Sequence, residues 1–214
     1  MTPKYELVYF NIRGLAEMTR LLLTDQDIEF QDTQISDREE WAKVKENFSF
    51  GQIPCLKENG KTDVVQTGAI MRHLARVHNL GGDSECEKTF ADMFFEGIRD
   101  LHSKYGPLIY VHYDEPGKKE EFLGTTLPTA LAQLEKLFKT HANGEKFVLG
   151  EKISYVDYTL FEELDVMLVL DTHFLDNFAL LKAFHERMAA RPNLKAYLEK
   201  RAASGIKING NGKQ

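Results

Sequence analysis

The sequence predicts a chain of two structural classes, an α/β part over residues 1–80 followed by an all-α part over residues 84–214. In the first part, short apolar runs typical of strands alternate with segments of helical spacing. In the second part, apolar residues recur at every third or fourth position almost throughout, which is typical of amphipathic helices. With 214 residues, the chain is long enough for two small domains with adequate cores.

The first part is predicted to begin with a strand, a helix and a second, short strand. Residues 5–10 predict the first strand, and residues 28–30 predict the second. Residues 14–26 predict the helix between them, because its apolar residues share one face: Leu15, Met18, Leu21 and Leu22.

A ββα unit is predicted next. Proline cannot donate to a sheet ladder, so Pro54 is expected at the first residue of a strand. The Asn-Gly turn signal at Asn59 separates this strand from another that ends at Val65. Thr67 is predicted as the N-cap of a helix over residues 69–74. The order βαβ followed by ββα matches a thioredoxin-like fold.

The second part is expected to follow a linker over residues 80–83 and to open with a long helix. The apolar face of this helix consists of Phe90, Phe94, Ile98, Leu101 and Tyr105. The Gly106-Pro107 pair is expected to interrupt and kink it, because proline lacks a backbone N–H. Further helices are expected over residues 127–138 and 192–201.

A capping box is predicted at Ser154 and Asp157, with Ile153 and Tyr158 as its hydrophobic staple. The run that starts at Leu160 is apolar on more than one side. A helix of this kind is expected at the centre of the helical part.

Composition argues against several classes of function. The net charge of -6 is unfavourable for nucleic-acid or anionic-membrane partners. No apolar run approaches the roughly 20 residues that span a bilayer, and the N-terminus has no apolar signal region. Cys55 and Cys86 form no Cys-x-x-Cys motif, so we expect no disulfide framework and a cytoplasmic protein. The seven histidines form no i, i+4 pair, so we expect no metal.

The segment around Pro54 combines two binding features. Proline pushes Ile53 into an extended conformation, which leaves its backbone groups free to pair with an extended peptide. The amides at the helix start near Thr67 favour an anion. A small acidic peptide would satisfy both features, although the segment alone fits an ordinary ββα unit equally well.

A resemblance favours the first interpretation. Gln52-Ile53-Pro54 and Gln66-Thr67-Gly68-Ala69-Ile70 resemble the glutathione-binding half of a cytosolic glutathione transferase. Tyr-Phe-x-Ile-Arg-Gly at 9–14 and the ending Asn-Gly-Asn-Gly-Lys-Gln at 209–214 resemble the pi class, and within it nematode members. The resemblance covers essentially the whole chain. It implies a thioredoxin-like glutathione-binding domain over 1–80 and an all-helical domain over 84–214, which carries the electrophile site and much of a dimer interface.

For the glutathione site, the resemblance implies that Tyr9 donates a hydrogen bond to the thiolate. The residues alone favour a core tyrosine in an amphipathic strand. Arg13 is implied to organise the γ-glutamyl end and the field near sulfur. Trp41 and Lys45 are implied to bind the glycine carboxylate, with Lys43 as the alternative to Lys45. The other residues implied to bind glutathione are Gln52, Ile53, Gln66, Thr67 and Asp100.

For the electrophile site, the resemblance implies Phe10, Ile12 and Tyr110, with Asn209 closing the site from the C-terminal end. Pro107 precedes Tyr110 where the class does not have a proline, and the expected kink would move Tyr110. The resemblance also implies a homodimer, in which Phe50 enters a pocket of the second subunit. Asp100 would then reach the partner's glutathione.

These features predict an enzyme that adds the glutathione thiolate to small hydrophobic electrophiles, a detoxification reaction. Glutathione is its co-substrate and no cofactor is expected. The alternatives are a ligand-binding or structural protein with little catalysis, as in related lens crystallins, and a glutathione-dependent isomerase. A disulfide oxidoreductase is least favoured, because no cysteine lies near Tyr9 in the sequence.

Overall fold

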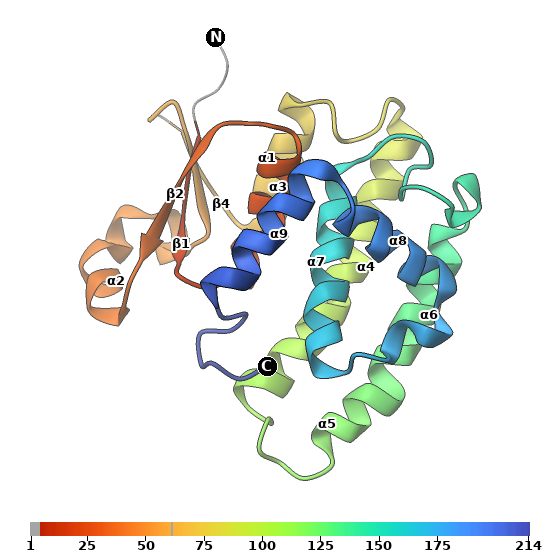
Figure 1. Ribbon diagram of the computed structural model, residues 1–214. Coiled ribbons are helices and arrows are strands. Elements are labelled where there is room, and N and C mark those ends of the chain that lie inside the picture. Colours follow the sequence, from red (N-terminus) through yellow and green to blue (C-terminus); the bar gives the residue numbers. More distant parts are fainter. Residues whose placement is uncertain (1–4, 61) are drawn as a thin grey trace.

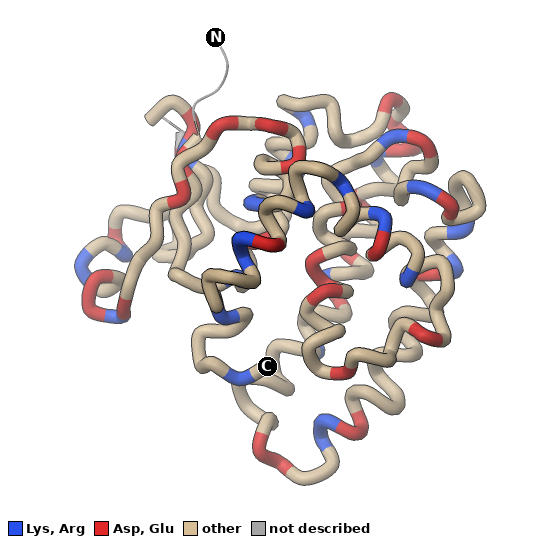
Figure 2. The backbone as a smooth tube through the Cα atoms, in the orientation of Figure 1, with Lys and Arg blue, Asp and Glu red and all other residues tan. Residues whose placement is uncertain are grey.

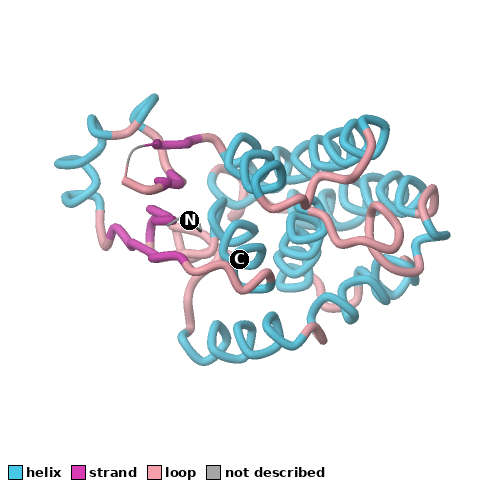
Figure 3. Tube along the Cα trace, turned by 90° about the horizontal axis from the view of Figure 1, so that it is seen from above, coloured by secondary structure: helices cyan, strands magenta, loops and turns pink. Residues whose placement is uncertain are grey.

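The computed structural model describes residues 5–60 and 62–214, which form an α/β part and a helical part packed side by side (Figure 1). This arrangement confirms the predicted fold class, with a thioredoxin-like N-terminal part. Seen from above, the strands gather at one end of the molecule and the helices fill the rest (Figure 3). Acidic and basic residues are interspersed along the backbone (Figure 2). No helix in the described ranges is long and apolar enough to cross a membrane.

The α/β part contains one mixed sheet of four strands in the order β2-β1-β3-β4. The central strand β1 (Tyr5–Phe10) pairs in parallel with β2 (Phe30–Ile35). It pairs antiparallel with β3 (Cys55–Glu58), which in turn pairs antiparallel with β4 (Thr62–Val65). Cys55 directly follows Pro54, so the proline does stand at the entrance to a strand.

Successive residues of a strand point to opposite faces of the sheet. Apolar clusters cover both faces. Leu7 packs into the large core together with Leu21 of α1. Val8 packs into a smaller cluster with Ile35 and Phe48 on the other face. Figure 1 shows α1 and α3 between the sheet and the helical part, and α2 on the outer side.

Helices make up most of the remaining chain, and α7 lies at their centre. Nearly every residue of α7 is buried, and it contacts α1, α3, α4 and α8. The central buried helix was therefore predicted correctly. The helices are α1 (Glu17–Asp25), α2 (Arg38–Val44), α3 (Thr67–Val77), α4 (Glu85–Tyr110), α5 (Lys118–Glu121), α6 (Leu127–Phe138), α7 (Tyr155–Leu170), α8 (Ala179–Ala189) and α9 (Pro192–Ser204).

The second strand differs from its prediction. It was expected over residues 28–30 and instead spans Phe30–Ile35. Most of β2 is exposed or half-buried, because it is an edge strand, and its sequence therefore lacks apolar alternation. Pairing with β1 holds it in place.

One helical prediction also needs correction, and three helices were not predicted, namely α2, α5 and α8. Helix α3 begins at Thr67, and its N-cap is Gln66 rather than Thr67. Helix α2 was not predicted, because it has no buried residue and only Trp41 and Val44 pack, half-buried, against the smaller cluster. Helix α8 was not predicted either, although Leu181, Phe184 and Met188 carry a helical spacing that could have shown it.

Pro107 does not interrupt α4, which continues to Tyr110. Proline in a helix removes one hydrogen bond and crowds the preceding residue. Here the preceding residue is Gly106, which has no Cβ to crowd. The carbonyl that loses its partner belongs to the exposed Ser103 and is within reach of water. Tyr110 therefore remains in the helix.

The predicted capping box of α7 is present and buried. The carboxylate of Asp157 accepts bonds from the Ser154 N–H and hydroxyl, each at 2.7 Å, and from the Val148 N–H at 2.8 Å. Burial raises the pKa of Asp157 to about 6, against the opposing effect of these donors. The box thus anchors the chain that precedes α7 as well as the helix start.

Replacing the Ser154 hydroxyl tests this anchor. Ser154→Ala is expected to lower the free energy of unfolding by about 1–2 kcal/mol, since the buried Asp157 loses a donor that water cannot replace. Ser84→Ala is the matched control, because Ser84 and Glu87 form an exposed capping box at α4. Denaturant unfolding of both variants measures the difference, and equal losses would show that burial of the α7 box is unimportant.

Candidate active site

The site is centred on Tyr9, at the end of β1. Tyr9 is only 7% exposed, and its hydroxyl oxygen accepts a hydrogen bond from the Leu15 N–H at 3.2 Å. Its hydroxyl proton has no acceptor among the described residues and is free to donate to a ligand. Burial raises the pKa of Tyr9, and the Leu15 N–H with the charges of Arg20 and Arg99 offsets this only in part. Tyr9 is therefore a neutral hydrogen-bond donor at neutral pH.

Gly14 allows the close approach of this loop to Tyr9. Its φ is +42°, and a Cβ there would lie 2.7 Å from the Tyr9 hydroxyl oxygen. The N–H groups of Arg13 and Gly14 donate to the carbonyls of Lys207 and Ile208. The loop after β1 is thus held between Tyr9 and the C-terminal segment.

The Arg13 side chain is buried and bound to α7. Its Nε and Nη2 donate to the two carboxylate oxygens of Glu162 at 3.1 and 2.9 Å, and Nη2 also donates to Asp165 at 2.7 Å. These contacts join the two parts of the chain. Nε and Nη2 of the guanidinium are engaged with carboxylates, so Arg13 supports the loop beside Tyr9, and its Nη1 makes no hydrogen bond with a described residue.

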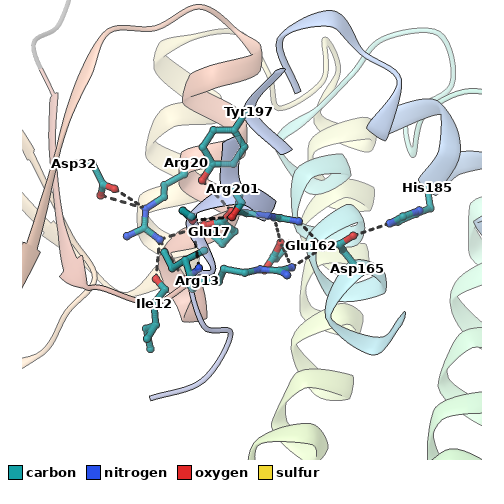
Figure 4. A network of polar contacts seen from close by, with 12 residues as sticks. Ile12, Arg13, Glu17, Arg20, Asp32, Glu162, Asp165, His185, Tyr197 and Arg201 are labelled. Carbon is teal, nitrogen blue, oxygen red and sulfur yellow. Dashed lines mark hydrogen bonds and ion pairs between the residues drawn. The ribbon is translucent and has the colours of Figure 1, made fainter. Parts of the chain in front are cut away.

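Arg13 belongs to a larger ion network at the junction of the two parts (Figure 4). Arg201 of α9 pairs with Glu17 of α1 and with both acidic partners of Arg13. Arg20 pairs with Glu17 at 3.2 Å and with Asp32 of β2 at 3.1 Å. The network therefore fixes α1, α7, α9 and the sheet relative to one another.

The pKa values of two carboxylates in the network are shifted in opposite directions. Burial raises the pKa of Glu162, and the charges of Arg13 and Arg201 oppose this. Burial also acts to raise the pKa of Asp165, but the hydrogen bond from His185 and the two arginines outweigh it and hold that pKa below its usual range. Asp165 is therefore ionised under all ordinary conditions.

The residues expected to bind glutathione gather on the sheet side of Tyr9. Gln66 donates from its amide to the Gln52 amide oxygen at 2.7 Å, so these two side chains are brought together. Thr67 follows as the first residue of α3 and is buried. Ile53 is half-buried and is joined to Pro54 by a cis peptide bond.

The residues expected at the glycine carboxylate lie on the outer side of the same part. The Trp41 ring packs against Phe10 and Phe48, with ring centroids 5.7 Å apart in each case. The aliphatic part of Lys45 lies against Gly51, where a Cβ would meet it at 2.9 Å. Lys43 is exposed in the last turn of α2. The choice between the two lysines stays open.

The residues expected at the electrophile site lie near Tyr9 and the C-terminal segment. Phe10 lies beside Tyr9, with ring centroids 5.6 Å apart, and Ile12 packs close to the Gly14 loop. Tyr110 is 56% exposed and accepts a hydrogen bond from the Gly210 N–H at 3.0 Å. The pairing leaves its hydroxyl proton free to donate.

The Asn209 side chain is bound to α4 and to the C-terminal segment. It is buried, and its amide nitrogen donates to the Tyr105 hydroxyl at 2.6 Å and to the Lys213 carbonyl at 2.9 Å. Asn211 donates to the carbonyl of Ile109 at 2.9 Å. Asn209 therefore ties the C-terminal segment to α4, and the contact of that segment with Tyr110 comes from Gly210.

Two further predicted residues are exposed, away from Tyr9. Phe50 is 81% exposed and has a φ of +59°, an uncommon conformation for a bulky side chain. Asp100 lies exposed on α4, and its side chain makes no hydrogen bond or ion pair with a described residue. Both are free to meet a partner.

Sequence reasoning missed Arg99 on α4 and the roles of Gly14 and Leu15. Gly14 could have been suspected, because a glycine follows the strand that carries Tyr9. The two cysteines are free: Cys55 is buried, which raises its pKa to about 11, and Cys86 is exposed. Across the described residues, no group of His, Cys, Asp and Glu could hold a metal ion.

Comparisons with known proteins show which family this chain is similar to. Residues 5–76 match the family model of the glutathione S-transferase N-terminal domain, and residues 99–201 match that of the C-terminal domain. The chain is 54% identical over 210 residues to glutathione S-transferase 2 of Onchocerca volvulus, covering 98% of this chain and 99% of the relative. It is 53% identical over 209 residues to glutathione S-transferase P of Caenorhabditis elegans, with the same coverage. The solved Onchocerca volvulus pi-class glutathione S-transferase superposes with a TM-score of 0.95 at 53% identity, covering 100% of both chains.

A Cβ at position 14 should disturb the site directly. Gly14→Ala is expected to displace the Tyr9 hydroxyl and lower glutathione-conjugating activity by about 10- to 100-fold, because small misplacements of this kind are costly. Gly124→Ala is the control, since a Cβ there meets nothing within 4 Å. Steady-state kinetics of both variants provide the measurement. Equal activities would mean that the close approach at Gly14 does not matter.

Proposed function

This chain belongs to the glutathione S-transferase family, pi class, and is a glutathione transferase, and we propose that Tyr9 activates the thiol of its co-substrate, glutathione. The observation that carries the proposal is the free hydroxyl proton of Tyr9, since its oxygen already accepts from the Leu15 N–H. A free thiol has a pKa of about 8.5, and a hydrogen bond donated to the thiolate lowers it. A shift of 2 units corresponds to ~2.7 kcal/mol.

The rest of the tripeptide lies along the edge of the sheet in this proposal. The main chain of Ile53 pairs with the cysteinyl unit, and the side chains of Gln52 and Gln66 hold its polar atoms. The γ-glutamyl carboxylate binds at Thr67, where the first N–H groups of α3 have no partner within the helix. Trp41 and a lysine, Lys45 or Lys43, hold the glycine carboxylate.

The reaction is addition of the glutathione sulfur to a small hydrophobic electrophile. The thiol proton leaves to solvent and a sulfur–carbon bond forms. In conjugate addition the carbanion that results takes up a proton from solvent, and in aromatic substitution a halide leaves the ring that sulfur has joined. Phe10 and Ile12 supply the apolar surface, and the free proton of Tyr110 can meet negative charge that develops on the electrophile. Arg13 and Asn209 act by holding the loop and the C-terminal segment around this site.

The two parts of the chain have separate tasks in this proposal. Residues 1–80 bind glutathione, and residues 84–214 carry the electrophile site and much of a dimer interface. We also place the enzyme in the cytoplasm, as its cysteine usage and resemblance imply. A panel of aldehydes, aryl halides, isothiocyanates and isomerase substrates would define the reaction, because a glutathione-dependent isomerase uses the same glutathione site.

We propose further that the enzyme is a homodimer. Phe50 is the most exposed large hydrophobic residue described, and its left-handed backbone presents it outward. Strain of this kind persists where a binding role requires it. In the proposed dimer Phe50 enters a pocket between helices of the second subunit. Asp100 then reaches the γ-glutamyl amine of the partner's glutathione, so each site is composite.

Tyr9→Phe tests the activation step. The variant keeps the packing of the ring and should still bind glutathione, but the pKa of the bound thiol should rise toward the free value. Turnover near neutral pH should fall by about 10- to 1,000-fold, the scale of losing one stabilising donor. Thiolate absorbance against pH measures the bound thiol. Tyr5→Phe, at the other end of β1, is the control, and an unchanged bound-thiol pKa in Tyr9→Phe would exclude Tyr9 as the activating residue.

Phe50→Ala tests the dimer. It should weaken dimerisation by about 2 kcal/mol or more, the scale of an aromatic anchor in a pocket. It should also raise the apparent constant for glutathione, because the same loop carries Gln52 and Ile53. Asp100→Asn is the contrasting variant, expected to weaken glutathione binding in an intact dimer. Sedimentation at several concentrations with glutathione titration measures both, and a fully active wild-type monomer would contradict the proposal.

A further inference from the structure

Arg99 of α4 has a buried guanidinium nitrogen without a partner. Its Nη1 is one of only three buried side-chain nitrogen or oxygen atoms among the described residues that make no hydrogen bond. The other two, in Arg20 and Glu163, belong to side chains that are bound through their remaining polar atoms. Arg99 forms no hydrogen bond or ion pair with any described residue.

This situation is unusual for the arginines of this chain. Each of the other arginines with a buried or half-buried side chain is bound to carboxylates or to a carbonyl, and these are Arg13, Arg20, Arg72, Arg187, Arg191 and Arg201. An unpaired buried cation is costly, so proteins almost always provide a partner. The charge of Arg99 is therefore left without an internal counter-charge, which makes it available to act on a negatively charged group nearby.

The position of Arg99 on α4 relates it to the proposed glutathione site. Phe95, one turn earlier on the same face of α4, approaches Gly68 at the start of α3, where a Cβ would lie 3.2 Å from the ring. The charge of Arg99 also acts on the Tyr9 hydroxyl and lowers its pKa. Arg99 thus lies on α4 one turn after Phe95, which meets the start of α3, and about three turns before Tyr110, which binds the C-terminal segment.

We propose that Arg99 is a second group that favours the thiolate of bound glutathione, acting through the positive charge of its unpaired guanidinium. The inference rests on the proposed function, because it takes the sulfur to lie at Tyr9. Tyr9 supplies a directed hydrogen bond, and Arg99 supplies a cation whose field is weakly screened in this partly buried position. Arg99 is a positioning residue in this role, since it acts on the charge of the sulfur without taking part in bond formation.

Other charged and titratable groups around Tyr9 do not supply this effect equally. Arg20 of α1 also lowers the pKa of Tyr9, but its charge is balanced by Glu17 and Asp32. Tyr110 of α4 acts in the opposite direction and raises the pKa of Tyr9. Among the cations that act on Tyr9, Arg99 is therefore the one whose charge no described residue balances.

Arg99→Gln tests the inference by removing the charge while keeping a polar side chain of similar reach. The pKa of bound glutathione, from thiolate absorbance against pH, should rise by about 1 unit, a tenfold change in the thiol–thiolate equilibrium. The affinity for S-methylglutathione, which has no thiolate, should change less than about threefold. Arg99→Lys keeps the charge and should retain most of the lowering of the bound-thiol pKa. This variant therefore also tests the inference if Arg99→Gln does not fold.

Arg76→Gln is the matched control, because it removes one positive charge from an exposed position on α3. An unchanged bound-thiol pKa in Arg99→Gln, or a complete loss of the lowered pKa in Arg99→Lys, would overturn the inference. So would a loss of S-methylglutathione affinity with an unchanged thiol pKa, which would place the γ-glutamyl carboxylate at Arg99. If wild-type protein does not lower the thiol pKa, or Tyr9→Phe does not raise it, the proposed function itself fails.

Discussion

The buried ion network between the α/β part and the helical part is the interaction on which the site depends. Three arginines, Arg13, Arg20 and Arg201, meet four carboxylates from α1, β2 and α7. Buried ion pairs contribute little net stability compared with apolar packing, but removing one partner costs about 3–5 kcal/mol. The network therefore penalises any displacement of its elements. Its consequence here is geometric: the loop after β1, which carries Arg13 and Gly14, has one position relative to α7.

A second set of contacts links the ion network to Tyr9 and Tyr110. The loop amides of Arg13 and Gly14 bind the C-terminal segment, which α4 in turn holds through Tyr105 and Tyr110. The two tyrosines of the site, Tyr9 and Tyr110, are thus held in place by backbone and side-chain donors. In the case of Tyr9 and Tyr110, the arrangement occupies the hydroxyl oxygen and leaves the proton available for a ligand. Preorganised donors of this kind stabilise developing negative charge without further rearrangement.

Much of the fold could be predicted, because its strongest signals are local. The bounds of β1 and α6 agree with their apolar patterns, and the Ser154 capping box marked the start of α7. Strand β2 and helix α2 could not be predicted in the same way, since they bury few side chains or none. Their structure depends on partners that are distant in the sequence.

The candidate site could be predicted only in part, for the same reason. Its residues were identified by resemblance, but the contacts of their side chains were not. Arg13 meets Glu162 across 149 positions, and Asn209 meets Tyr105 across 104, so no local pattern shows that both act as supports. The unpaired nitrogen of Arg99 also became visible only when the surrounding elements were in place.

The distance between the glutathione sulfur and the Tyr9 hydroxyl oxygen, in a structure of the complex, is the most direct test of this account. The account predicts that the sulfur lies within hydrogen-bond reach of Tyr9, about 3.5 Å or less, while the Leu15 N–H and the Arg13–Glu162 contacts remain as they are. A glutathione sulfur that lies out of reach of Tyr9, with Arg13 released from Glu162 to hold the ligand, would contradict it.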